Sequence, residues 1–157
     1  MNPIILAIFL SMAPISELRG GIPFAMLNGI NPLAAYIICV IANIAVVPLI
    51  FFFLDTLHHQ FYRIKVYKRI FDKFVERTRK KLHKKVEKYG YLGLTLFVAV
   101  PLPVTGAWTG TLGAWLFGMD KMKAMLAILL GVLIAGVIVT AAMLAGGNGL
   151  SIFVKLI

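Results

Sequence analysis

The chain has 157 residues, of which 61% are hydrophobic and 14% charged, and its mean hydropathy is +0.92. Soluble domains carry about 25% charged residues, so this composition excludes an ordinary soluble domain and predicts a single membrane domain over residues 1–157. The lone cysteine excludes a disulfide framework, and the net charge of +10 is concentrated in one segment, which favours a membrane surface over nucleic acid as the partner.

The first segment, residues 3–56, contains a polar break within an apolar sequence. Residues 4–12 are apolar, but at ~1.5 Å per residue they cover about half of a ~30 Å hydrocarbon core. The next stretch carries Glu17 and Arg19, which at membrane depth need cover from protein or a water cavity. Two short arms around this break predict a re-entrant hairpin, with one irregular spanning helix as the alternative. The residues that we expect to break the helix are Pro14, Gly20, Gly21 and Pro23.

A long apolar helix and a basic helix come next. Asn31 is a predicted N-cap and Pro32 a predicted first helical residue, and residues 33–54 are long enough to span a membrane. Residues 57–89 repeat apolar side chains every three or four positions opposite a basic face, which predicts an amphipathic linker helix. It would lie in the membrane interface, or form a solvated cytoplasmic hairpin. We expect anionic lipid headgroups to bind its basic patch: Arg77, Arg79, Lys80, Lys81, Lys84, Lys85 and Lys88.

Residues 90–147 repeat the order of the first segment. A short apolar arm over residues 91–100 precedes a second break, and Asp120 caps a long apolar run over residues 122–144, with an apolar tail over residues 148–157. With a shift of 89 residues, Pro14 falls on Pro103 and Asn31 falls on Asp120. The sequence therefore predicts two copies of a hairpin followed by a transmembrane helix. The residues that we expect to break the second hairpin are Pro101, Pro103, Gly106 and Gly110.

The orientation of the halves follows from counting crossings. A re-entrant hairpin returns to its own side, so each half crosses the membrane an odd number of times and the two halves form an inverted repeat. The positive-inside rule makes the basic linker cytoplasmic and places both termini outside, in the plasma membrane of a prokaryote. Ala127, Gly131 and Ala135 form a small-residue seam, which favours a homodimer.

The two breaks supply the residues of a predicted substrate and proton site. Exposed helix N-termini favour anions, and Arg19 adds a planar donor fork for a phosphate or carboxylate. Glu17 is the candidate proton carrier, because burial favours a protonated carboxyl while the nearby guanidinium opposes it. Hydroxyl and indole groups complete the site: Ser16, Thr105, Thr109 and Trp108. The alternative is a structural ion pair between Glu17 and Arg19.

Other classes of site have no support in the sequence. No spacing of His, Cys, Asp or Glu predicts a metal site, and the sequence has neither a nucleotide-binding glycine loop nor a nucleophile–base pair on one element. We therefore expect no cofactor and no enzymatic activity.

Two motifs, SELRGGIP and PLPVTGAWTG, flank the basic helix and resemble the family described as putative small multidrug export proteins. The resemblance covers nearly the whole chain. The opposed re-entrant hairpins are also similar to the DedA (VTT-domain) superfamily, which is associated with moving lipid phosphates such as the polyprenyl-phosphate carrier. That similarity implies a Glu on the first hairpin, matched by Glu17, and Arg residues on the second, which residues 101–110 lack. Arg19 would then act alone or with a second subunit.

These patterns together predict a small dimeric secondary transporter or flippase. Glu17 would carry a proton and Arg19 would bind an amphiphilic anion such as a lipid phosphate. Two alternatives remain open. One is proton-coupled export of lipophilic cations with Glu17 as the exchange site, and the other is a non-transporting scaffold whose basic helix recruits partners to anionic lipid.

Overall fold

The computed structural model describes residues 2–102 and 105–146, and these ranges are helical throughout apart from caps and turns. The helices are α1 (Pro3–Met12), α2 (Glu17–Leu27), α3 (Pro32–Phe52), the π-helix η1 (Phe53–Leu57), α4 (His58–Phe61), α5 (Lys65–Ala99), α6 (Ala107–Leu116) and α7 (Lys121–Leu144). Within these ranges two candidate membrane spans meet the length and hydropathy requirements, Pro32–Leu57 and Lys121–Leu144, and about half of each is buried within the chain. Both predicted long helices are therefore confirmed.

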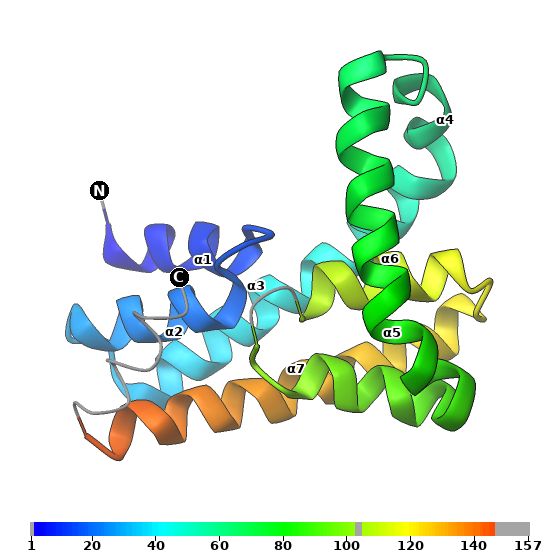
Figure 1. The fold of residues 1–157 in the computed structure, drawn as a ribbon. Helices are drawn as coiled ribbons and strands as arrows, with labels where there is room; N and C mark the ends of the chain where they lie inside the picture. The colour runs from blue at the N-terminus through cyan, green and yellow to red at the C-terminus, as the bar shows by residue number, and fades with distance from the viewer. Residues whose placement is uncertain (1, 103–104, 147–157) are drawn as a thin grey trace.

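The short helices form two hairpins on either side of the middle of the molecule (Figure 1). α1 and α2 pack against each other beside one half of α7, and residues 91–99 of α5 pair with α6 beside the other half. The tips of the two hairpins face each other about midway along α7 (Figure 1). The basic part of α5 and the short α4 extend from the body as a separate helical hairpin, at the end where α7 begins.

The helical elements recur with the offset of 89 residues read from the sequence. α2 corresponds to α6, and α3 and α7 begin 89 residues apart. The turns before the long helices share the same geometry, because Gly29 (φ 80°) and Gly118 (φ 60°) both adopt left-handed backbone that favours glycine. Each turn then ends in an N-cap, where the side chains of Asn31 and Asp120 accept hydrogen bonds from backbone N–H groups of the following helix. The same local signals therefore act twice in the chain.

Four of the predicted helix breakers lie inside helices, which corrects the sequence analysis. Gly20, Gly21 and Pro23 belong to α2, and Gly110 belongs to α6. Two of these glycines serve close packing instead: a Cβ on Gly21 would lie 1.8 Å from the Ser11 hydroxyl oxygen, and one on Gly110 would lie 2.6 Å from Val98. Pro14, Pro101 and Gly106 do lie between helices, and Pro103 falls outside the described residues.

The predicted linker helix is corrected at its start, because the chain turns at residues 62–64 and α5 begins only at Lys65. No glycine or proline makes the first turn. Aromatic packing holds it instead, with the His58 ring 4.2 Å from that of Phe71, and the Tyr62 hydroxyl donates to Asp72 over 2.9 Å. At Gly90 the backbone is non-helical (φ 55°, ψ −127°), so residues 91–99 run as a separate arm.

The apolar stripe of the basic helix contacts other helices of the same chain. Leu82 and Thr78 are buried, and a Cβ on Gly113 of α6 would lie 2.1 Å from a Leu82 methyl carbon. Phe71 and Phe74 pack in an apolar cluster that includes Leu54 and Leu112. These contacts dock the α4–α5 hairpin onto α6, so only part of the predicted stripe is left to meet a membrane surface.

The small-residue seam on α7 is occupied within the chain. A Cβ on Gly131 would lie 2.6 Å from Val98, and Ala127 and Ala135 are both buried. The seam therefore lets residues 91–99 approach α7 closely. It gives no support to the predicted homodimer, which stays a prediction.

Candidate functional site

Glu17 joins the tips of the two hairpins. It is the first residue of α2, is 5% exposed, and has a positive φ of 47° that is unusual for a residue with a side chain. Its Oε1 atom accepts a hydrogen bond from the backbone N–H of Trp108, in the first turn of α6, over 3.2 Å. The carboxyl group therefore occupies the N-terminus of α6, where free N–H groups and the helix dipole favour negative charge.

Gly106 makes this contact possible, because a Cβ at that position would lie 1.7 Å from Glu17 Oε2. Gly106 also has backbone angles (φ 135°, ψ −164°) that are almost restricted to glycine. Glu17 and Gly106 lie 89 residues apart, which is also the offset between the starts of α3 and α7. Because the two residues are in contact, there is room for a side chain at only one of them.

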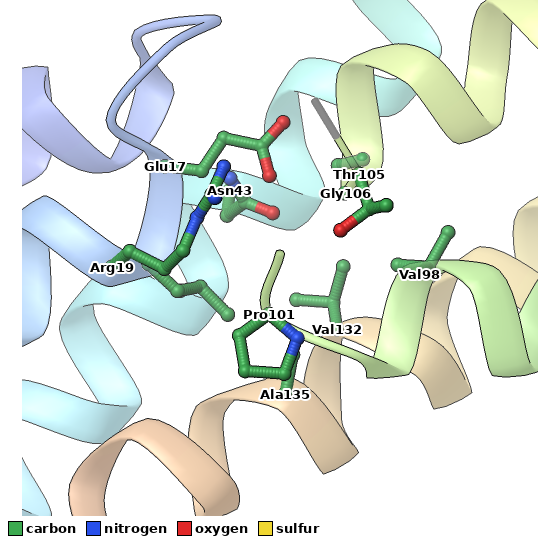
Figure 2. A pocket seen from close by; sticks show the side chains of 11 residues that line it. Glu17, Arg19, Asn43, Val98, Pro101, Thr105, Gly106, Val132 and Ala135 are labelled. Carbon is green, nitrogen blue, oxygen red and sulfur yellow. The ribbon is translucent and has the colours of Figure 1, made fainter. Parts of the chain in front are cut away.

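A small cavity of about 10 Å³ lies beside Glu17, between the hairpin tips (Figure 2). It has space for about one water molecule. Asn43 of α3 and Val132 of α7 line it, and each lies at the middle of its candidate span, Pro32–Leu57 or Lys121–Leu144. The site is therefore at half the length of both long helices.

Arg19 lines the same cavity and is half-buried. Among the described residues it forms no hydrogen bond and no ion pair, so the structural ion pair with Glu17 is not formed. Figure 2 shows the side chains of Glu17, Arg19 and Asn43 extending toward one another. The guanidinium group thus keeps its donors for another partner.

Asn43 is a polar side chain in the cavity lining that was not among the predicted site residues. Its side chain is 1% exposed, and its Nδ2 atom donates to the Ser11 carbonyl over 2.7 Å. Its Oδ1 atom is buried and has no hydrogen-bond partner in the part of the chain that the structure describes. A buried acceptor without a partner costs about 1–3 kcal/mol of folding free energy. A water molecule or substrate group that donates a hydrogen bond to Oδ1 in this cavity would remove that cost. The sequence signal that could have identified Asn43 is a polar amide side chain at the middle of an apolar spanning helix.

The remaining predicted site residues divide into two groups. Thr105 lines the cavity, but its hydroxyl donates to the Val100 carbonyl over 2.7 Å and so holds the loop before α6. Trp108 does not line this cavity, and its indole N–H donates to the Met12 carbonyl over 2.9 Å. Ser16 and Thr109 do not line the cavity, and the Thr109 hydroxyl donates to the Gly106 carbonyl over 3.4 Å.

Charged groups outside this site form surface contacts. Asp55 pairs with Lys121 over 2.5 Å and accepts from the Trp115 indole N–H over 3.2 Å, which ties η1 to the end of α6 and the start of α7. In the basic hairpin, the hydrogen bond from Lys80 lowers the pKa of the Glu76 carboxyl below its ordinary value. Binding of anionic headgroups to the basic patch stays a prediction. Within the described ranges, no cluster of His, Cys, Asp or Glu could hold a metal ion.

These features define an all-helical membrane protein with two long apolar helices and a buried acidic site between two short hairpins. Residues 17–138 match the model of the family described as "Putative small multi-drug export protein". The match covers well over half of the chain, which therefore belongs to this family of membrane transporters. No curated protein and no solved structure matches the chain.

Proposed function

We propose that this protein is a proton-coupled exporter of lipophilic cations and that Glu17 is its exchange site. The observation that carries the proposal is the position of the Glu17 carboxyl group, buried at the N-terminus of α6 and halfway along both candidate spans. An acid at this depth is a functional-site hypothesis in its own right. The family description supports export of drugs as the activity.

The proposed membrane architecture is an inverted repeat of two re-entrant hairpins. It is supported by helix length: α1 has 10 residues and α2 has 11, or about 15 Å each at ~1.5 Å per residue, against a hydrocarbon core of ~30 Å. It is also supported by the tips meeting midway along α7 (Figure 1). Broken helices that meet near the midplane are the usual setting of transporter sites.

The proposed exchange follows from the limited space at Glu17. A carboxyl group that is protonated cannot also neutralise a cationic substrate, so proton entry from one side of the membrane and cation binding from the other compete. The cavity of about 10 Å³ accommodates a water molecule but not a drug. The hairpin tips must therefore separate to admit a substrate to the carboxyl group.

Glu17→Gln tests this function, because glutamine keeps the shape of the side chain and the acceptor for the Trp108 N–H but cannot exchange a proton. In proteoliposomes with an imposed pH gradient, we expect the variant to lose efflux of a cationic dye. Glu76→Gln is the matched control, since Glu76 is an exposed glutamate on α5, and it should export like the wild type. Normal dye export by Glu17→Gln would contradict the proposal.

A second candidate, transport of an amphiphilic anion such as a lipid phosphate, is favoured by the Arg19 guanidinium, which has no hydrogen-bond partner among the described residues and lies beside two helix N-termini. Arg19→Gln separates the candidates. If the substrate is anionic, this variant should lose transport of a fluorescent lipid phosphate in liposomes. If the substrate is cationic, dye export should persist. Wild-type flipping of lipid phosphate by Arg19→Gln would refute the second candidate.

A further inference from the structure

A larger apolar cavity, of about 350 Å³, is lined by Trp108, the residue whose backbone contacts Glu17. Helices α1, α3 and α6 and the π-helix η1 surround it. Its lining consists of the side chains of Met12, Val46, Leu49, Ile50, Phe53 and Trp108. The volume is at the lower end of the range of small-molecule sites, about 300–1,000 Å³. The cavity can therefore hold a compact apolar molecule.

The cavity is reachable from the outer face of α3. Leu49 is 57% exposed, whereas Val46 and Ile50, which form its inner wall, are buried. On the described part of α3, the outward side chains are apolar around this point and include Ile41 and Phe52. A lipophilic molecule dissolved in the hydrocarbon core would reach the cavity without crossing a polar surface.

Trp108 connects this cavity to Glu17. Its ring lines the cavity, its indole N–H is held by the Met12 carbonyl over 2.9 Å, and its backbone N–H donates to Glu17 Oε1 over 3.2 Å. A fixed indole ring favours aromatic ligands by stacking and cationic ligands by attraction to its face. Trp108 therefore contacts both the apolar cavity, through its ring, and Glu17, through its backbone N–H.

We propose that the apolar cavity at Trp108 is the entry site for the exported substrate and that it binds aromatic lipophilic cations. This inference rests on the proposed function and names its substrate class. A lipid acyl chain would fill the apolar space but has neither a ring nor a charge for Trp108. A cation bound against the face of the Trp108 ring lies next to the residue that contacts Glu17. Exchange with the proton on Glu17 begins from this bound position.

The test measures equilibrium binding of radiolabelled tetraphenylphosphonium to the purified full-length protein in detergent. Leu49→Trp fills the cavity mouth, and Leu33→Trp is the matched control, because Leu33 is an exposed leucine of α3 (67%) that does not line the cavity. We expect Leu49→Trp to raise the Kd at least tenfold and Leu33→Trp to leave it within twofold. Leu49→Phe, a smaller change, should give an intermediate Kd and keeps the test valid if the tryptophan variant does not fold.

Three results would overturn the inference. The first is an equal Kd for the wild type and the folded Leu49 variants. The second is displacement of the probe by a neutral long-chain alkane but not by aromatic cations, which would indicate an acyl-chain site, and the third is loss of a dimer in Leu49→Trp without a change in Kd, which would indicate a contact with a second copy of the chain. The Glu17→Gln variant distinguishes failure of this inference from failure of the proposed function. If that variant binds the probe and still exports dye, the exchange role of Glu17 fails, while the cavity is judged by the Leu49 variants alone.

Discussion

Gly106→Ala is the substitution that tests the contact between the hairpin tips most directly. The new Cβ would lie 1.7 Å from Glu17 Oε2, so the carboxyl group must leave the N-terminus of α6. Backbone strain at a position almost restricted to glycine costs about 1–3 kcal/mol. Loss of the hydrogen bond between the Trp108 N–H and a charged carboxylate costs about 1.5–3 kcal/mol. The expected loss of stability is about 2.5–6 kcal/mol, a large part of a typical total of ~5–15 kcal/mol.

The assay is unfolding by SDS from detergent micelles, followed by the loss of helical circular dichroism. Gly118→Ala is the matched control, because Gly118 also has a positive φ (60°) but a Cβ at that position would meet no atom within 4 Å. It should cost only the backbone strain, about 1–2 kcal/mol. The difference between the two glycine variants measures the displacement of Glu17.

A double-mutant cycle isolates the contact further. Glu17→Ala alone loses the hydrogen bond, and in the double variant with Gly106→Ala the same bond is lost only once. The double variant should therefore be about as stable as Gly106→Ala alone, with a coupling energy of about 1.5–3 kcal/mol. Additive effects, or equal losses for Gly106→Ala and Gly118→Ala, would refute the reasoning that Glu17 occupies the space opposite Gly106.

Three further predictions concern packing, the cavity and topology. Gly113→Ala should destabilise the protein by about 1–3 kcal/mol, because its Cβ would lie 2.1 Å from a Leu82 methyl carbon, and it should cost less than this in a Leu82→Ala background in the same unfolding assay. Asn43→Leu should change stability by less than about 1 kcal/mol, since it removes a buried acceptor without a partner together with one hydrogen bond, but should abolish dye export; unchanged export would exclude Asn43 from the site. In a Cys39→Ser background, a cysteine at Lys73 should react with an impermeant maleimide only from the cytoplasmic side, and one at Ile15 from neither side; labelling of the second from either side would argue against a re-entrant tip.

The sequence by itself determined the elements whose signals are local. The membrane class, both long helices, their caps at Asn31 and Asp120, and the turn at Gly90 follow from hydropathy, capping chemistry and glycine geometry. The repeat offset of 89 residues predicted the recurrence of α2 and α3 as α6 and α7. These features need no knowledge of which residues meet in space.

Only the tertiary structure decided the roles of residues whose partners are distant in the sequence. Gly21 and Gly110 looked like helix breakers, yet their lack of a side chain permits close helix contacts. The turn at residues 62–64 has no local signal and depends on aromatic packing, and the free Asn43 acceptor appears only when α3 meets the hairpin tips. A composition pattern records that a residue is small or polar, whereas the fold determines what lies opposite it, and this is why Glu17 could be named from the sequence but its contact with Gly106 could not.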